Sequence, residues 1–118
     1  MSRLIKSFEY AFKGLKYAFI TQPNYRIHVF AALMALLAGV LLHLSANEWL
    51  WIMLSVALVL GAELLNTAIE LLTDIVSPAY SEKAGHVKDI AAAAVTVAAV
   101  FAFLTGLLIF APKISRLF

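Results

Sequence analysis

The stretch GAELLNTAIELLTD, residues 61–74, places four polar side chains inside an otherwise apolar segment. At about 100° per residue, the four fall on one narrow face of a helix. A carboxylate in hydrocarbon is costly, and such groups usually face a bundle interior or a water-filled pocket where they take part in function. This face is therefore predicted to be a functional site. Its members are Glu63, Asn66, Glu70 and Asp74.

The composition indicates that the solvent around the chain is lipid. The 118 residues are 64% hydrophobic and 14% charged, whereas soluble proteins carry roughly 25% charged residues. One soluble domain of this length could not bury so much apolar surface. The net charge is only +2, and the basic residues form no stripe of the kind that binds nucleic acid. The absence of cysteine excludes disulfides and thiolate metal sites.

Four helical segments are predicted within a single membrane-embedded domain, residues 1–118. Residues 3–20 carry apolar side chains at helical spacing and basic ones opposite, which is typical of an amphipathic helix in the membrane interface. A soluble surface helix is the alternative. Pro23 disfavours helix at Gln22 and ends this segment, and residues 77–89 are predicted to form a polar loop. Three stretches are long enough to cross a bilayer, which takes about 20 residues: 27–46, 49–76 and 90–111.

The basic residues predict the orientation of the chain, because loops rich in lysine and arginine stay in the cytoplasm. This places the amino terminus and the 77–89 loop in the cytoplasm and the carboxyl terminus outside. The polar face of residues 61–74 then opens toward the cytoplasm, and Trp49 and Trp51 lie at the outer interface. The basic residues on the cytoplasmic side are Arg3, Lys6, Lys13, Lys16, Arg26, Lys83 and Lys88, and those on the outer side are Lys113 and Arg116.

Polar residues that converge on the cytoplasmic side suit phosphoryl transfer to a lipid hydroxyl. The three carboxylates of the polar face, together with Asp89, can hold a hard cation such as Mg²⁺, which usually binds alongside phosphate. Lys88 is a point charge suited to a phosphate oxygen. Glu63 lies deeper, and a desolvated carboxylate is a better proton acceptor than a solvated one. The polar residues where the first span begins are Gln22, Asn24, Arg26 and His28.

Plainer structural roles exist for most of these residues. Asp74 alone would be a solvated charge at a helix end, Asn66 alone would join helices, and His28 and His43 would lie at the interfaces. Glu63 differs, because about 14 uncharged residues precede it. The chain has no standard nucleotide-binding signature. A small ion-coupled transporter with Glu63 as its proton carrier therefore stays open as an alternative.

The run AELLNTAIE at 62–70, followed by KDIAAAAV at 88–95, resembles the prokaryotic diacylglycerol kinase family, which includes the undecaprenol kinases. The likeness extends from RLIKSFEYAFKGLKYAF, residues 3–19, through the third span. It implies an all-α integral membrane homotrimer in the bacterial inner membrane, with a surface helix and three spans per subunit. It also implies transfer of the γ-phosphate of MgATP to a lipid alcohol, at sites that assemble between neighbouring subunits.

The same resemblance assigns roles position by position. Glu63 corresponds to the catalytic base, and Asn66 to a residue close to the reaction centre. Glu70 corresponds to a metal-binding glutamate, whereas Gln22 stands where the family commonly has a second one, so a second metal would be held more weakly or a neighbour would compensate. The ATP-binding positions are Arg3, Tyr10, Gln22, Glu70, Ala79, Tyr80, Ser81, Lys88 and Asp89. The lipid-contacting positions are Glu63, Asn24, Arg26 and His28.

The stretch NYRIH, residues 24–28, bears on the choice of lipid. Histidine stands where the diacylglycerol-specific enzymes of Gram-negative bacteria usually carry glutamate, so this R-x-H resembles the undecaprenol kinase branch. The expected reaction is therefore phosphorylation of undecaprenol to undecaprenyl phosphate, with diacylglycerol and phosphatidic acid as the alternative. Both substrates offer a primary hydroxyl near the interface, and helical periodicity does not separate them.

Overall fold

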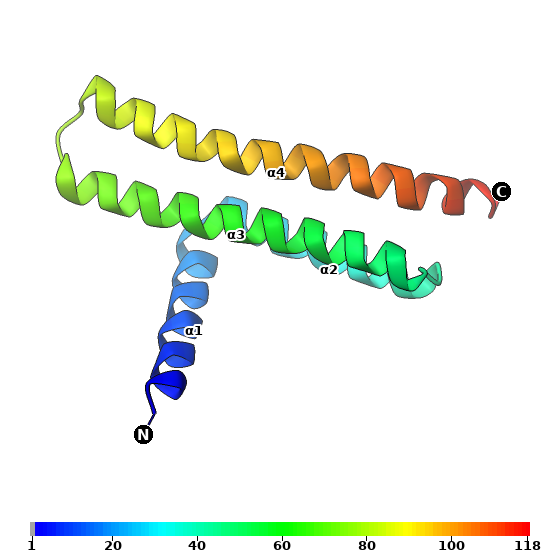
Figure 1. Cartoon of the computed structure of the whole chain (residues 1–118). Helices are drawn as coiled ribbons and strands as arrows, with labels where there is room; N and C mark the ends of the chain where they lie inside the picture. The colour runs from blue at the N-terminus through cyan, green and yellow to red at the C-terminus, as the bar shows by residue number, and fades with distance from the viewer. Residues whose placement is uncertain (1) are drawn as a thin grey trace.

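The computed structural model describes residues 2–118, and this part of the chain folds into helices joined by short connections. The helices are α1 (Arg3–Thr21), α2 (Pro23–Leu41), α3 (Ala46–Val76) and α4 (Glu82–Ser115) (Figure 1). The last three are each long and apolar enough to cross a membrane. The predicted all-α fold, with three long apolar helices after an N-terminal helix, is thus confirmed. Residue 1 of the predicted domain lies outside the described residues.

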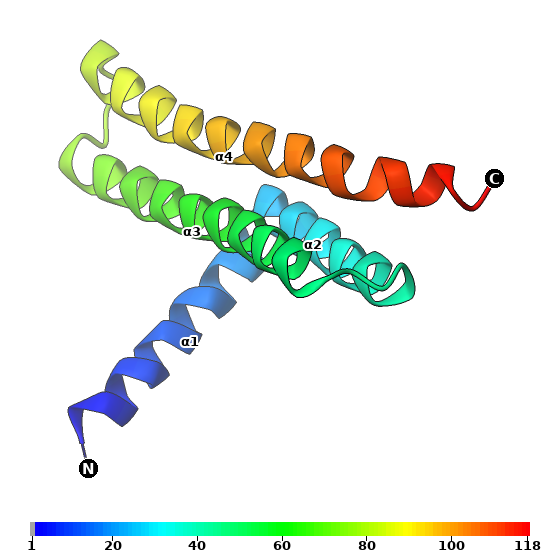
Figure 2. The same cartoon turned by 45° about the vertical axis from the view of Figure 1, so that its right-hand side comes forward.

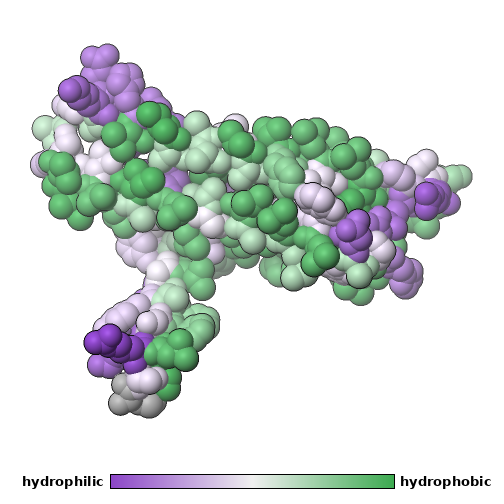
Figure 3. All heavy atoms as spheres, viewed as in Figure 1, coloured by the Kyte–Doolittle hydropathy of each residue, from purple (hydrophilic) through white to green (hydrophobic). Residues whose placement is uncertain are grey.

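Helix α3 forms the centre of the arrangement. Helix α4 runs antiparallel along it, α2 packs beside it, and α1 leaves the other three at a steep angle (Figures 1 and 2). Both α2 and α4 pack against α3, so α3 forms the base of the space between α2 and α4. On the face seen in Figure 3 the middle of the molecule, over α3 and α4, is mainly hydrophobic, and hydrophilic residues gather toward its ends.

The junction between α1 and α2 follows from a proline. Gln22 is extended, with φ −114° and ψ 104°, and Pro23 occupies the first turn of α2, where its missing N–H costs nothing. The guanidinium of Arg26 then reaches back and donates to the carbonyl oxygens of Phe19 at 2.7 Å and Ile20 at 2.9 Å. These are carbonyls that the end of α1 leaves without helical partners. Arg26 thereby fixes the sharp turn between the two helices.

The turn between α2 and α3 lies inside the predicted first span. Helix α2 ends at Leu41 rather than near residue 46, and His43 has a positive φ of 55°. The cause is a strong helix start at Ser45. Its hydroxyl accepts from the N–H of Glu48 at 3.2 Å, and the Glu48 carboxylate accepts from the N–H of Ser45 at 2.9 Å. This reciprocal capping box sets the beginning of α3 at Ala46.

The connection between α3 and α4 is shorter than the predicted polar loop at 77–89. Helix α4 begins at Glu82, so the polar residues after it form helical turns. Ser81 caps them, because its hydroxyl accepts from the N–H of Ala84 at 3.1 Å. The carboxylate of Glu82 also suits the positive end of a helix dipole. A polar sequence here indicates exposure to water rather than an absence of helix.

An ion pair joins α3 and α4 at each end of their antiparallel hairpin. At the end nearest the loop, Lys88 Nζ lies 2.6 Å from Asp74 Oδ1. At the opposite end, Lys113 Nζ lies 3.1 Å from Glu48 Oε1. These are called the Asp74 end and the Glu48 end below. The second pair also explains why α4 continues past Pro112 to Ser115, since Lys113 in the last turn is held by a carboxylate and complements the dipole.

Candidate active site on the polar face of α3

Glu63 is the most deeply buried ionisable group among the described residues, with 3% of its surface exposed. Its main-chain oxygen accepts a hydrogen bond from the Thr67 hydroxyl at 2.9 Å. Its carboxylate has a separate neighbour on α2, since Oε1 lies 3.3 Å from Nε2 of His28. The predicted deep carboxylate is therefore buried against one neighbouring helix rather than left in hydrocarbon.

A groove of about 500 Å³ opens beside Glu63, between α2 and α4. We call it the Glu63 groove. A second hollow of about 280 Å³ shares His28, Ala99 and Phe103 with it and continues along α3 toward the Glu48 end. The second hollow is lined mainly by apolar side chains, whereas polar side chains gather in the Glu63 groove. The residues that line the Glu63 groove are Asn24, His28, Glu63, Asn66, Ala92, Val95, Thr96, Ala99, Val100 and Phe103.

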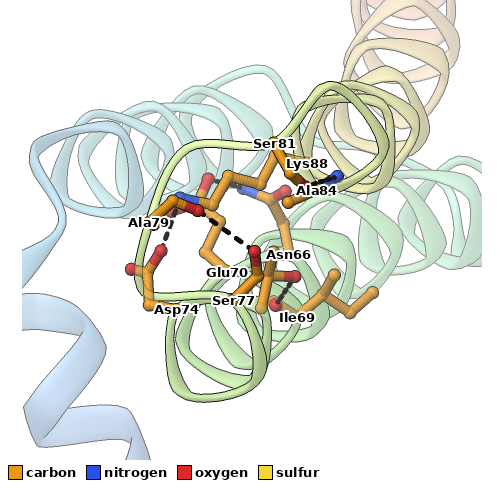
Figure 4. Close-up of polar contacts among 10 residues, drawn as sticks. Asn66, Ile69, Glu70, Asp74, Ser77, Ala79, Ser81, Ala84 and Lys88 are labelled. Carbon is orange, nitrogen blue, oxygen red and sulfur yellow. Dashed lines mark hydrogen bonds and ion pairs between the residues drawn. The ribbon is translucent and has the colours of Figure 1, made fainter.

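One turn further along α3, Asn66 and Glu70 form a pair. The Asn66 amide nitrogen donates to Glu70 Oε1 at 3.2 Å (Figure 4). The amide oxygen of Asn66 is buried and has no hydrogen-bond partner within residues 2–118. A buried acceptor without a donor is unusual. This oxygen, next to a carboxylate, is thus suited to receive a donor or cation from a bound substrate.

Lys88 and Asp74 form the outermost polar contact of this face (Figure 4). The ammonium donates to Asp74 Oδ1 at 2.6 Å, and the two side chains keep 41% and 62% of their surface exposed. Lys88 precedes the predicted span at 90–111, and its hydrogen bond to Asp74 raises its pKa above the ordinary value. Lys88 therefore stays cationic and accessible to an anion that arrives from water.

The remaining predicted positions lie outside this line of contacts. Arg3, Tyr10, Ala79, Tyr80 and Asp89 are exposed. Arg26 binds the end of α1, and the side chain of Gln22 donates to the Thr21 hydroxyl at 3.3 Å. In the described part of the chain no hydrogen bond joins Gln22 to Glu70, and Ser81 acts as the cap of α4.

Two features of the site lie outside the sequence-based predictions. Thr96 and Phe103 line the Glu63 groove from α4, and with Ala92 and Ala99 they follow the helical spacing of a single face, which is a readable signal. Asp74, which alone suits a solvated charge, is paired with Lys88. Opposite charges on the two sides of a short connection between antiparallel helices would have predicted that pair.

Comparison with known proteins places the chain in a family. Residues 9–110 match the family model described as prokaryotic diacylglycerol kinase. The chain is 43% identical to a diacylglycerol kinase of Synechocystis over 97% of its own length and 66% of that protein, just under two thirds. It is 40% identical to the undecaprenol kinase of Bacillus subtilis, over 97% of this chain and 93% of that protein.

A diacylglycerol kinase of Escherichia coli K12 is 36% identical, over 88% of this chain and 85% of the relative. The family match covers all of the contacts from Glu63 to Lys88 described above, together with α2, α3 and α4 as far as residue 110. The chain therefore belongs to the prokaryotic diacylglycerol kinase family and is a lipid kinase of the membrane.

Proposed function

We propose that this lipid kinase transfers the γ-phosphate of ATP to undecaprenol, with Glu63 as the general base. The observation that carries the proposal is the position of Glu63. Its residue surface is only 3% exposed, and it lies at a groove that opens between two apolar helices. A lipid alcohol can reach such a groove from the bilayer, whereas a water-soluble acceptor would have to enter hydrocarbon. The proposed acceptor is therefore a membrane lipid with a terminal hydroxyl.

The proposed step needs one proton acceptor and one electrophile. The Glu63 carboxylate takes the proton of the lipid hydroxyl while the hydroxyl oxygen bonds to the γ-phosphorus. The bond from that phosphorus to the bridging oxygen breaks, and ADP leaves with the electron pair. Asn66 lies beside this centre, and its unpaired amide oxygen is available to orient a donor on either substrate. The lipid-contacting positions Asn24 and His28 line the same groove.

The nucleotide is proposed to bind at the Asp74 end. Lys88 keeps its charge and part of its surface exposed, so its ammonium can leave Asp74 for a phosphate oxygen. Asp89, Ala79 and Tyr80 are exposed, and Ser81 is half-buried. The family resemblance assigns these positions to nucleotide binding, and the exposure of Lys88 and Asp89 supports access by water-soluble ATP.

We further propose a homotrimer. The amino-terminal end of α1, which carries Arg3, lies well apart from the loop between α3 and α4 in both views (Figures 1 and 2). One chain therefore does not gather all of the predicted nucleotide contacts. Helix α4 buries only Ala91 within the chain, which leaves an apolar surface for a neighbour or for lipid. A neighbouring subunit could supply Arg3 and Tyr10 to a shared site.

The residues at the Asp74 end fit Mg²⁺ that arrives with the nucleotide. No cluster of three or more histidine, aspartate or glutamate side chains suited to a metal occurs within residues 2–118. Mg²⁺, however, commonly uses one or two carboxylates together with phosphate oxygens and water. Glu70 and the unpaired oxygen of Asn66 are the oxygens offered here. Bound Mg²⁺ would neutralise developing phosphate charge, and Gln22 remains a proposed neutral ligand.

Undecaprenol is favoured by two features, and diacylglycerol remains the second candidate. His28 lies against Glu63, at the position where the R-x-H stretch resembles the undecaprenol kinases, and the Bacillus subtilis undecaprenol kinase is similar over 93% of its length. Diacylglycerol is supported by the names of the Synechocystis and Escherichia coli relatives. We propose that the active site lies on the cytoplasmic side of the inner membrane, because loops rich in lysine and arginine stay in the cytoplasm.

A side-by-side assay tests the proposal. The purified full chain is reconstituted into liposomes that contain undecaprenol or diacylglycerol at equal mole fraction, and γ-labelled ATP with Mg²⁺ is added. Label should enter lipid faster with undecaprenol. Faster labelling of diacylglycerol would overturn the choice of lipid. Proton movement without labelled lipid would instead support the transporter alternative.

A further inference from the structure

The contact between His28 and Glu63 has a feature that a simple lipid-contacting role does not explain. Within residues 2–118, the imidazole is the one side-chain partner of the Glu63 carboxylate, at 3.3 Å between Nε2 and Oε1. The contact is a close approach of an imidazole nitrogen to a carboxylate oxygen. A carboxylate oxygen can only accept, so a hydrogen bond between the two requires an N–H on Nε2. The histidine side chain itself keeps 26% of its surface exposed, against 4% for that of Glu63.

The other residues around the Glu63 groove offer no charged replacement for this donor. Glu63 and His28 are the two ionisable side chains among those that line it, and the α4 side contributes Thr96 with alanine, valine and phenylalanine. The Thr96 hydroxyl already donates to the Ala92 carbonyl at 3.3 Å. Without this donor the carboxylate would be free to rotate, which is unfavourable for proton transfer because a catalytic group must be held in its productive geometry.

We propose that His28 is a positioning residue for the base. Its Nε2–H holds Glu63 Oε1 and thereby leaves the second carboxylate oxygen to take the proton of the lipid hydroxyl. This inference rests on the proposed role of Glu63, but it differs from a lipid-contacting role in what it affects. A positioning residue acts on the chemical step, so its loss lowers kcat, whereas the loss of a lipid contact raises the KM for lipid.

Three variants in the full chain test this role by kinetics. His28→Leu removes the donor, and His28→Gln keeps an N–H near the position of Nε2. The matched control is His86→Gln, because His86 contacts Glu82 at 3.8 Å in a largely exposed pair on α4. We expect His28→Leu to lower kcat by about ten- to a hundredfold, the effect of one hydrogen bond to a charged group, with the KM for lipid unchanged. His28→Gln should restore most of the rate, and His86→Gln should match the wild type.

Other kinetic outcomes would overturn the proposal. A higher KM for lipid at unchanged kcat in His28→Leu would make His28 a lipid contact alone. A His28→Gln variant as slow as His28→Leu would show that the donor is not what matters. Wild-type rates in both His28 variants would remove any role in the reaction.

An NMR experiment tests the contact between His28 and Glu63 even if no lipid is phosphorylated. The chain has three histidines, so selective ¹⁵N labelling resolves three imidazoles in detergent micelles. Glu63→Gln should shift the His28 nitrogen resonances and leave those of His43 and His86 in place. Unmoved His28 resonances would overturn the proposal. Failure of the wild type to label either lipid would instead overturn the proposed function.

Discussion

The two ends of the α3–α4 hairpin carry ion pairs of opposite character. At the Glu48 end, the pair with Lys113 is 28% and 20% exposed, and the same carboxylate also closes the capping box of α3. At the Asp74 end, the pair with Lys88 is 62% and 41% exposed, and the described contacts give its carboxylate no second partner. A carboxylate with several fixed partners clamps two helices. A carboxylate with one exposed partner can release that partner to a ligand.

The contrast between a clamped end and an end that can bind a ligand extends to the two halves of α3. The half that begins at Ala46 is held by its cap, by Trp49 against Gly39, and by the pair with Lys113. The other half carries a buried carboxylate, Glu63, at a groove. Among the described residues, each half has one buried side-chain oxygen without a hydrogen-bond partner, Ser55 Oγ in the first and the Asn66 amide oxygen in the second, so the buried carboxylate is what separates them. Costly buried charges persist in natural proteins mainly where function needs them. We therefore assign stability to the Glu48 half and chemistry to the Asp74 half.

The largest expected effect is on turnover, in Glu63→Gln. The amide has nearly the same shape as the carboxylate but cannot accept the proton of the lipid hydroxyl, so turnover should fall by roughly 10² or more. The initial rate of lipid phosphorylation measures this, and the thermal unfolding midpoint in the same detergent controls for folding. Near-normal turnover would remove Glu63 from the role of base.

Lys88→Ala should have the next largest effect and should separate nucleotide binding from packing. Phosphate charge grows along the reaction coordinate, so the ammonium should favour the transition state. We expect a higher KM for ATP and a kcat lower by about tenfold, the effect of one charge-assisted hydrogen bond. Steady-state kinetics at varied ATP measure both. Unchanged ATP kinetics would show that the Asp74–Lys88 pair only holds the two helices together, as the Glu48–Lys113 pair does. The two ends would then not differ in function.

Gly39→Ala should have the smallest effect, on stability alone. A Cβ at Gly39 would lie 2.6 Å from Trp49 Cη2 and 2.9 Å from Leu44 Cδ1, so both side chains would have to shift to make room. Overpacking should outweigh the gain from removing a helical glycine and leave a net loss of about 1 kcal/mol. The matched control is Gly85→Ala, where a Cβ meets nothing within 4 Å. A Gly39→Ala variant as stable as this control would contradict the packing described.

The helices could be predicted well from the sequence, but their ends could not. Apolar runs and Pro23 predict three spans and a break at Gln22, as found. The turn after α2 lies earlier than expected because the Ser45 cap begins α3, and α4 begins earlier because Ser81 caps it. Short-range polar contacts decide such ends, and a hydropathy pattern does not contain them.

The site could be predicted as a face but not as a set of contacts. The helical spacing predicts that Glu63, Asn66 and Glu70 share one side of α3, and the pair between the last two agrees with it. The contact of His28 with Glu63 depends on how α2 packs against α3. No local pattern in a single sequence carries that information, because it is set by the sharp turn at Pro23 and the packing beyond it.

The contrast between the two ends is tested most directly by exchanging the charges of each pair. In Asp74→Lys/Lys88→Asp the ion pair can form again with its charges reversed. Glu48→Lys/Lys113→Glu also lets the ion pair at the other end form again, but it removes the carboxylate that accepts from the Ser45 N–H. The initial rate of lipid phosphorylation is measured for both in the same liposomes. We predict a rate lower by about tenfold or more for the first variant, since a carboxylate at 88 repels phosphate, and a rate near wild type for the second. Wild-type turnover in Asp74→Lys/Lys88→Asp would contradict the account.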